Sequence, residues 1–164
     1  MIDLWTIFSL NEKGIAKCES LVDDALANGG AALLGGRRSR EGTLFYEPTL
    51  LVDMDPKMKI YSDEVFGPVA PIYTFSTEEE ALKMANNTNY GLAAYVFTEN
   101  IGRSWRVAEG FEAGAIGVNT TDVVSESLPF GGWKESGLGR ENGVTGSLDA
   151  YCEQKALIIS GIQK

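Results

Sequence analysis

The sequence has no histidine and only two cysteines among its 164 residues. The absence of imidazole excludes Ser–His and Cys–His nucleophile pairs, histidine metal ligands and histidine pH switches. Cys18 and Cys152 are far apart, so they indicate no disulfide framework and we expect reduced thiols. Cys18 lies on an apolar helix face and fits core packing, while Cys152 has no evident activating pocket. Chemistry in this chain must use carboxylates, lysines, thiols or a bound cofactor.

Positive charge and long apolar runs are also scarce. The chain has 14 Lys and Arg against 23 Asp and Glu, a net charge of −9, which argues against a phosphate-backbone partner and an anionic membrane surface. Apolar runs such as 156–160 are far shorter than the roughly 20 residues of a membrane span, and the first ten residues lack the basic region of a leader peptide. We therefore expect a cytoplasmic chain that has neither nucleic acid nor membrane as a partner.

The hydrophobic content of 44% is enough to build a core, and its periodicity alternates along the chain. Helices are predicted at 11–28, 76–87 and 99–110, the last burying Ile101, Trp105 and Ala108. Strands are predicted at 31–34, 44–52, 70–75, 93–98, 115–119 and 154–160, with Pro48 marking an edge or a bend. The glycine-rich segment 129–146 is predicted to be a long ordered loop. This alternation indicates an α/β fold with a mostly parallel sheet flanked by helices.

Two segments have residues suited to ligand contacts. Glu64 and Phe66 alternate along an extended stretch, where a carboxylate can accept hydrogen bonds from a diol and a ring can support a planar heterocycle. The same pair also fits an exposed acid and a core phenylalanine. Phe130 and Trp133 flank two glycines that let the backbone approach a bound group, although a loop packed by its own aromatics has the same pattern. This glycine-rich loop matches neither a P-loop nor a GxGxxG motif after a strand.

Three further polar residues have two interpretations each. Arg140 and Glu153 can form an ion pair that ties the glycine-rich loop to the last predicted strand, or they are two solvated surface charges. Asn119 closes a predicted strand, where its amide can orient a substrate carbonyl or serve only the turn. The residues alone do not choose between these interpretations.

Four segments, in this order, resemble the C-terminal part of the NAD(P)-dependent aldehyde dehydrogenase family: SDEVFGPV (62–69), NYGLAAYVFTENIGRSWRVAE (89–109), AGAIGVNT (113–120) and LPFGGWKESGLGREN (128–142). The resemblance extends from about residue 11 to residue 160. It is strongest to the succinate-semialdehyde dehydrogenase branch, and the GRENG ending is also similar to betaine and aminoaldehyde dehydrogenases. It implies a divergent lead-in at 1–10, the C-terminal part of the catalytic domain at 11–150, and an oligomerisation strand and tail at 151–164.

The resemblance also implies roles for the candidate residues. Glu64 matches the glutamate that holds the nicotinamide ribose hydroxyls, and Phe66 matches the phenylalanine that contacts the nicotinamide. Phe130 matches an aromatic residue of the aldehyde pocket. Ser125 corresponds to a serine that semialdehyde dehydrogenases use toward the substrate carboxylate. The implied cofactor is NAD or NADP, and the implied substrate is a small aldehyde.

Assembly is implied by the same resemblance. Arg140 and Glu153 match a structural ion pair near the subunit interface of the family. The last predicted strand resembles one that joins the sheet of a neighbouring subunit. We therefore expect a homo-oligomer, or association with a full-length homologue.

The family's reactive groups are missing from these residues. Members of the family attack the aldehyde with a cysteine in a GQxC-type segment, use a glutamate in an ELGG-type segment, and bind most of the dinucleotide in a Rossmann-like domain. Neither Cys18 nor Cys152 matches that nucleophile, so no catalytic residue and no metal ligand is assigned here. We expect the isolated chain to be inactive. The alternatives are an interaction module, such as a truncated paralogue that assembles through its terminal strand, and a non-functional fragment.

Overall fold

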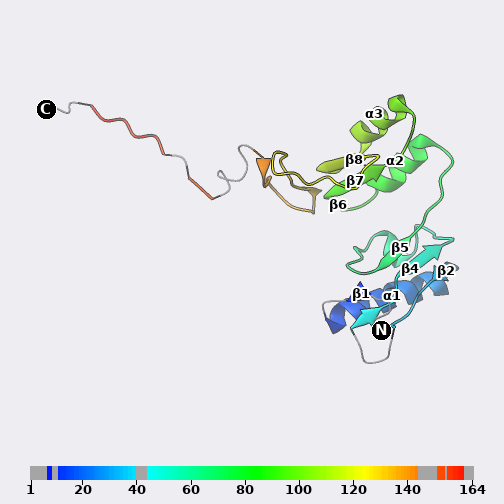
Figure 1. Cartoon of the computed structure of the whole chain (residues 1–164). Coiled ribbons are helices and arrows are strands. Elements are labelled where there is room, and N and C mark those ends of the chain that lie inside the picture. The colour runs from blue at the N-terminus through cyan, green and yellow to red at the C-terminus, as the bar shows by residue number, and fades with distance from the viewer. Residues whose placement is uncertain (1–6, 9–10, 40–43, 144–150, 154, 161–164) are drawn as a thin grey trace. The chain divides into compact units, whose positions relative to one another are not determined.

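A computed structural model describes residues 7–8, 11–39, 44–143, 151–153 and 155–160 (Figure 1). The chain divides into two compact units, a first unit at Met1–Thr77 and a second unit at Glu78–Lys164. None of the helices in the described ranges is long and apolar enough to cross a membrane. The predicted lead-in at 1–10 falls almost entirely outside the described residues, as do 144–150, Gln154 and 161–164.

Helix α1 (Glu12–Ala27) forms where its periodicity predicts it. Asn11 caps its first turn, because Asn11 Oδ1 accepts a hydrogen bond of 2.9 Å from the backbone N–H of Gly14. The helix ends at Ala27 with Asn28 as its C-cap, and Gly29 follows at φ +100°, a left-handed conformation that favours glycine. One face is buried, with Ile15, Cys18, Leu21, Val22 and Ala25.

A three-stranded sheet packs with this helix in the first unit. Its strands are β2 (Ala31–Leu34), β4 (Thr49–Val52) and β5 (Val69–Pro71), with β4 in the middle, antiparallel to β2 and parallel to β5. The predicted strand 44–52 is interrupted at Pro48, so β3 (Phe45–Tyr46) instead pairs antiparallel with β1 (Ile7–Phe8). Pro48 therefore lies in a break between two strands, because proline lacks the N–H that a continuous ladder requires.

The core of the first unit is a single apolar cluster. Tyr46 and Leu51 are completely inaccessible to solvent. The short 3-10 helix η1 (Lys59–Tyr61) closes this cluster against α1, and the backbone N–H of Lys59 donates a hydrogen bond of 2.8 Å to Asp24 Oδ2. The buried members are Ile15, Cys18, Leu21, Val22, Ala25, Tyr46, Leu51, Met58, Ile60 and Val69.

The second unit begins with α2 (Glu78–Asn86) and β6 (Tyr90–Gly91). Strands β7 (Ala93–Val96) and β8 (Ala115–Val118) pair in parallel, and α3 (Ile101–Gly110) connects them and packs against both strands and against α2 (Figure 1). The glycine-rich loop contains a short strand, β9 (Trp133–Lys134), which pairs antiparallel with β6. The mixed α/β class is confirmed, although the described strands form small sheets that pair in both directions.

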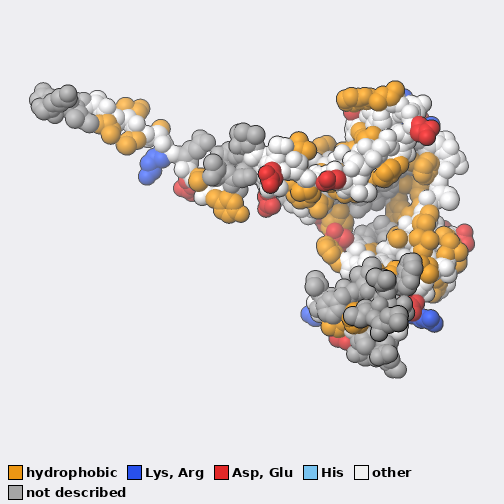
Figure 2. Space-filling view, viewed as in Figure 1, with side chains coloured by type: hydrophobic (Ala, Val, Ile, Leu, Met, Phe, Trp, Pro, Cys, Tyr) orange, Lys and Arg blue, Asp and Glu red, His pale blue; other side chains and the backbone are white. Residues whose placement is uncertain are grey.

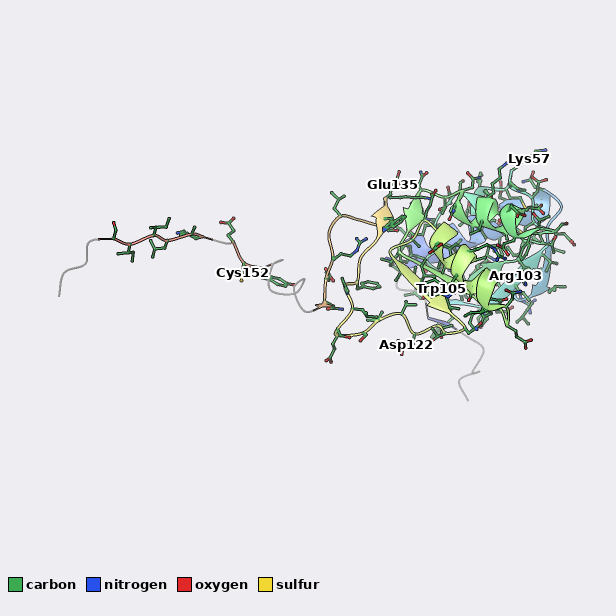
Figure 3. All side chains as sticks on the ribbon, turned by 90° about the horizontal axis from the view of Figure 1, so that it is seen from above. Lys57, Arg103, Trp105, Asp122, Glu135 and Cys152 are labelled. Carbon is green, nitrogen blue, oxygen red and sulfur yellow. The ribbon has the colours of Figure 1, made fainter. Side chains whose placement is uncertain are left out.

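The prediction for the buried face of α3 was wrong. Ile101 and Trp105 are 76% and 65% exposed, whereas Ser104 and Val107 are the buried residues of this helix. Trp105 is labelled in Figure 3. Residues 101 and 105 are one turn apart on the same side of the helix. That side is apolar, but the buried side of α3 is the one that carries Ser104 and Val107. The amphipathic pattern therefore identified an apolar face without identifying which face is covered.

The last predicted strand is absent as a strand within this chain. Residues 155–160, the described part of 154–160, have no strand assignment, and Leu157, Ile158 and Ile159 are 76%, 93% and 63% exposed. Strand geometry depends on a partner for the backbone N–H and C=O groups. No described strand of this chain supplies that partner.

Candidate functional site

Glu64 and Phe66 lie on a corner, residues 64–67, that connects η1 to β5. Before the corner, the backbone N–H of Asp63 donates a hydrogen bond of 2.9 Å to the carbonyl of Lys59. After it, the carbonyl of Pro68 accepts one of 2.8 Å from the backbone N–H of Thr49 in β4. The corner is therefore attached at both ends to elements that pack on the core of the first unit.

The corner packs against the side chain of Cys18 in α1. A Cβ atom added to Gly67 would collide with Cys18 Sγ, so a side chain at this position would force the thiol or the corner to shift. Cys18 is 1% exposed, and its burial raises the pKa of the thiol. The expected packing role of Cys18 is confirmed, because a neutral, buried thiol is a small apolar group.

The two side chains of the corner point to solvent. Phe66 is 77% exposed. The alternative interpretation of the sequence, in which Phe66 is a core residue, is therefore wrong. Glu64 is also exposed, and within the described residues its carboxylate has no hydrogen bond or ion pair. A carboxylate with free acceptor positions beside an accessible ring fits the ribose and nicotinamide part of a dinucleotide.

Ser125 and Phe130 lie in the second unit, in the loop that follows β8. Phe130 is half-buried and exchanges two backbone hydrogen bonds with Glu141, of 2.7 and 2.6 Å. Ser125 is exposed and organises its own turn, with Ser125 Oγ 3.1 Å from Ser127 Oγ and the carbonyl of Ser125 accepting from the N–H of Leu128 at 3.2 Å. The two candidate pocket residues share a loop, and no described contact joins their side chains.

Arg140 is bonded to its own loop. Its Nη1 donates hydrogen bonds to the carbonyls of Gly132 at 3.0 Å and Gly139 at 2.8 Å. Among the described residues no ion pair joins Arg140 to Glu153, so that pairing remains a prediction. Beside Arg140 is an open depression of about 520 Å³, lined by Glu112, Gly132, Trp133, Lys134, Gly137, Leu138, Gly139 and Arg140.

Both amide atoms of Asn119 make a hydrogen bond to the backbone of Thr98. Asn119 Oδ1 accepts a hydrogen bond of 2.8 Å from the N–H of Thr98, and Nδ2 donates one of 2.9 Å to the carbonyl of Thr98. The residue is left-handed at φ +55°, a conformation that asparagine tolerates better than most residues. These two hydrogen bonds support the turn interpretation, because the amide of Asn119 ties the end of β8 to the backbone of Thr98.

Lys134 is a polar centre that sequence reasoning missed. Its Nζ lies 2.7 Å from the carbonyl of Asn86, 3.0 Å from that of Thr88 and 2.6 Å from Glu112 Oε2. These partners are distant in sequence and two of them are backbone atoms, so no local pattern signals them. Among the described residues, no three Cys, Asp or Glu side chains come together in a group that could hold a metal ion.

Comparisons with known proteins agree on one family. The model of the aldehyde dehydrogenase family matches residues 9–157. The mitochondrial succinate-semialdehyde dehydrogenase of Oryza sativa subsp. japonica is 47% identical over 153 residues, which is 93% of this chain and 29% of that protein. This chain therefore spans less than a third of the length of that relative.

Solved structures give the same result. The crystal structure of succinate-semialdehyde dehydrogenase from Burkholderia pseudomallei is similar with a TM-score of 0.81 and 48% identity, over 86% of this chain and 29% of that one. Betaine aldehyde dehydrogenase from Staphylococcus aureus, in complex with NAD+, has a TM-score of 0.81 and 38% identity over 88% of this chain and 29% of that one. With a family match over most of its length and this agreement in fold, the chain belongs to the aldehyde dehydrogenase family.

Proposed function

We propose that this chain is the C-terminal portion of the catalytic domain of an NAD(P)-dependent aldehyde dehydrogenase whose substrate is succinate semialdehyde. The observation that carries the proposal is the corner at 64–67, where the unpaired carboxylate of Glu64 and the exposed ring of Phe66 are held in place by the packing of Gly67 on Cys18. Such a corner is suited to a ligand, because its backbone packs on the core while its exposed side chains have no partner among the described residues. The family match and the named relatives support the reaction class.

The proposed cofactor contacts divide between the two corner residues. Glu64 accepts hydrogen bonds from the ribose hydroxyls, and Phe66 contacts the nicotinamide side. When bound, NAD or NADP supplies the hydride acceptor for the oxidation. The choice between the two dinucleotides is left open, because the resemblance places the binding of the remaining dinucleotide in a Rossmann-like domain outside these residues.

The proposed substrate contacts come from the loop after β8. Phe130 forms a wall of the aldehyde pocket, and Ser125 faces the substrate carboxylate. The paired hydrogen bonds between Phe130 and Glu141 support this assignment, because they fix the backbone from which the ring projects. Betaine or an aminoaldehyde is the alternative substrate class, favoured by the GRENG ending and by the likeness to the betaine aldehyde dehydrogenase.

Catalysis also requires groups that these 164 residues do not contain. In the family a cysteine thiolate attacks the aldehyde, hydride transfer follows, and water then hydrolyses the thioester. Cys18 is buried with a raised pKa and belongs to the core, so it cannot take the place of that nucleophile. The isolated chain is therefore proposed to be inactive and to supply pocket wall and cofactor contacts only.

Assembly is proposed to use the C-terminal end of the chain. Residues 154–160 would add as a strand to the sheet of a neighbouring subunit, and Arg140 would pair with Glu153 near that interface. The exposed apolar side chains of Leu157, Ile158 and Ile159 support this proposal, because burial on a partner would remove them from water. The result is a homo-oligomer, or association with a full-length homologue, in the cytoplasm.

Two domain boundaries follow from the same proposal. Residues 11–150 are assigned to the catalytic domain and 151–164 to the oligomerisation strand and tail, with 1–10 as a lead-in. A non-catalytic interaction module remains the alternative for the chain by itself.

An assay of NAD(P)H formation by the purified chain with succinate semialdehyde tests the proposed inactivity. We expect no turnover with either NAD+ or NADP+. Saturable turnover would refute the assignment, since it would require a nucleophile within these residues.

A chimaeric enzyme tests the positive part of the proposal. In it, this chain replaces the matching segment of the succinate-semialdehyde dehydrogenase from Burkholderia pseudomallei. We expect oxidation of succinate semialdehyde in preference to betaine aldehyde. Glu64→Gln should raise the KM for the dinucleotide about tenfold, the size expected for one hydrogen bond to a charged group. The exposed Glu99→Gln is the matched control, and equal effects of the two substitutions would contradict the role of Glu64.

A further inference from the structure

The Lys134 side chain makes more polar contacts than a surface lysine usually does. Its three N–H donors have three oxygen partners within 3.0 Å: two backbone carbonyls, of Asn86 and Thr88, and the carboxylate of Glu112. Only 24% of the side chain is exposed. An ammonium group has three donors and no acceptor, so its hydrogen-bonding capacity is complete.

The partners of Lys134 belong to the ends of two helices. Asn86 is the last residue of α2, and Glu112 follows the end of α3. Carbonyls at a helix C-terminus lack an intrahelical donor and carry partial negative charge, so a cation is favourable there. The Asn86 side chain joins the same two ends, because Nδ2 donates to the carbonyl of Gly110 at 2.7 Å and Oδ1 accepts from the N–H of Glu112 at 2.9 Å.

The loop that carries Lys134 also carries Phe130. Before Lys134 in the sequence, the loop lies directly on the backbone that precedes β8, because a Cβ added to Gly114 would collide with the carbonyl of Gly131. After Lys134 in the sequence, Ser136 Oγ accepts a hydrogen bond of 2.9 Å from the N–H of Gly91 in β6. The loop therefore contacts its surroundings on both sides of the ammonium group.

We propose that Lys134 is a positioning residue, whose ammonium group holds the glycine-rich loop against the C-terminal ends of α2 and α3 and so fixes the backbone of Phe130. The lysine itself touches neither Ser125 nor Phe130 in the described contacts, so it acts through the loop. An exposed ion pair would contribute little, but here two of the acceptors are backbone carbonyls and the hydrogen bonds are charge-assisted. The importance of the loop for substrate rests on the proposed function, while the holding of the loop does not.

Amide hydrogen exchange on the full chain, followed by NMR, tests this assignment. In Lys134→Met, which keeps the length of the stem and removes the charge, we expect exchange at the amides of Phe130 and Glu141 to accelerate on the order of tenfold, the effect of losing one charge-assisted hydrogen bond. The amides of Leu51 and Val107 should be unchanged. The matched control is Lys83→Met, on the exposed side of α2, which should alter none of the four.

Chemical rescue separates positioning by the ammonium group from general packing. In a Cys152→Ser background, Lys134→Cys is treated with 2-bromoethylamine. The thiolate displaces bromide, forms a C–S bond and restores an ammonium group at nearly the length of lysine. Mass analysis confirms that the buried Cys18 is unmodified. We expect fast exchange at Phe130 and Glu141 before treatment and return to within about twofold of the original rate after it, a difference smaller than one hydrogen bond would give.

Three results would overturn the assignment. The first is unchanged exchange at Phe130 and Glu141 in Lys134→Met. The second is acceleration that includes Val107 equally, which would mean general destabilisation of the second unit. The third is failure of aminoethylation to restore slow exchange. None of these readouts depends on binding of a dinucleotide or an aldehyde, so the inference and the proposed function can fail separately.

Discussion

The two units of this chain are stabilised by different interactions. In the first unit, helix α1, η1 and strands β3 to β5 enclose one cluster of buried apolar side chains, including Ile15, Tyr46 and Leu51. In the second unit the buried apolar residues are few, with Val107 and Ala113 among them, and helix α2 has none. Burial of apolar surface therefore accounts for the first unit far better than for the second.

Polar contacts take a larger share in the second unit. Glu78 in the first turn of α2 accepts two hydrogen bonds from Arg106 of α3, at 2.8 and 2.9 Å, and these lower the pKa of Glu78. Asn86, Lys134 and Asn119 add contacts to backbone carbonyls or N–H groups. Apolar side chains meanwhile remain at the surface over α3 and along the C-terminal segment, as Figure 2 shows. Polar contacts between the elements, together with exposed apolar faces, are expected of a part of a larger fold whose other parts would cover those faces.

The largest expected effect is the loss of a core side chain from the first unit. Leu51→Ala removes a completely buried side chain from the middle strand, and we expect the free energy of unfolding to fall by about 2–5 kcal/mol. Urea denaturation followed by circular dichroism measures it. The control Leu138→Ala, at a fully exposed site of the second unit, should change it by less than about 0.5 kcal/mol. Equal effects would mean that burial of Leu51 does not stabilise the first unit.

In the second unit, backbone contact should matter more than side-chain burial. Gly114→Ala places a Cβ against the carbonyl of Gly131, and we expect a loss of about 1–3 kcal/mol from the forced shift of backbone. Gly102→Ala, within α3, places a Cβ 3.2 Å from Arg106 Nη1 and 3.4 Å from the capping Oδ1 of Asn100. These contacts are much looser than the one at Gly114, so the substitution should stabilise the protein by about 0.5–1 kcal/mol. Thermal unfolding that shows the same sign for both substitutions would contradict this interpretation.

Asn119 tests the polar framework one contact at a time. Asn119→Ala removes both side-chain hydrogen bonds to Thr98 and places alanine at φ +55°, so we expect a loss of about 1–2 kcal/mol. Asn119→Gly removes the same hydrogen bonds without the conformational cost. Its smaller loss in urea denaturation isolates the hydrogen bonds, and a loss as large as that of alanine would mean that the φ angle is irrelevant.

The smallest expected effect is a gain in the first unit. The hydroxyl of Tyr46 is buried without a hydrogen-bond partner in the described structure, so Tyr46→Phe should raise the free energy of unfolding by up to about 1 kcal/mol. Tyr151→Phe, at an exposed site, is the control. A clear loss of stability on Tyr46→Phe would show that the hydroxyl has a partner after all.

The same substitution should alter the response to alkaline pH. Burial raises the pKa values of Tyr46 and Cys18 in the folded chain, so both stay neutral there while the unfolded chain ionises at its usual values. The contribution of each raised pKa to the free energy of unfolding is complete below the usual pKa of the group, about 8.5 for cysteine and about 10 for tyrosine. Above that pH the contribution is lost, because the unfolded chain releases the proton and the folded chain keeps it. Urea midpoints measured from neutral to alkaline pH should fall less steeply above about pH 10 in Tyr46→Phe than in the original chain.

Local signals in the sequence predicted the elements that local interactions form. Helix α1 was foreseen from its apolar period and from Gly29, and its observed bounds lie within one residue of the predicted ones. Prediction was poorer where a distant partner decides the outcome. The apolar side of α3 at Ile101 and Trp105 was recognised, but periodicity does not say which side the sheet covers.

The candidate site divides in the same way. The type and spacing of Glu64 and Phe66 suggested a ligand, yet the residues alone also allowed an exposed acid and a core phenylalanine. The 77% exposure of Phe66 removed the core alternative. Lys134 was beyond reach, because its backbone partners are 46 and 48 positions away. A contact to a carbonyl leaves no trace in the type of the residue that provides it.

The position of Cys18 beneath Gly67 makes this thiol a natural reporter of motion. An alkylating reagent can reach the buried sulfur only after the packing around it, which includes Gly67, has moved aside. Cys152 is exposed in the same chain and supplies the unhindered reaction rate as an internal reference. The ratio of the two labelling rates therefore counts how often the corner beneath Glu64 and Phe66 opens, without any added probe.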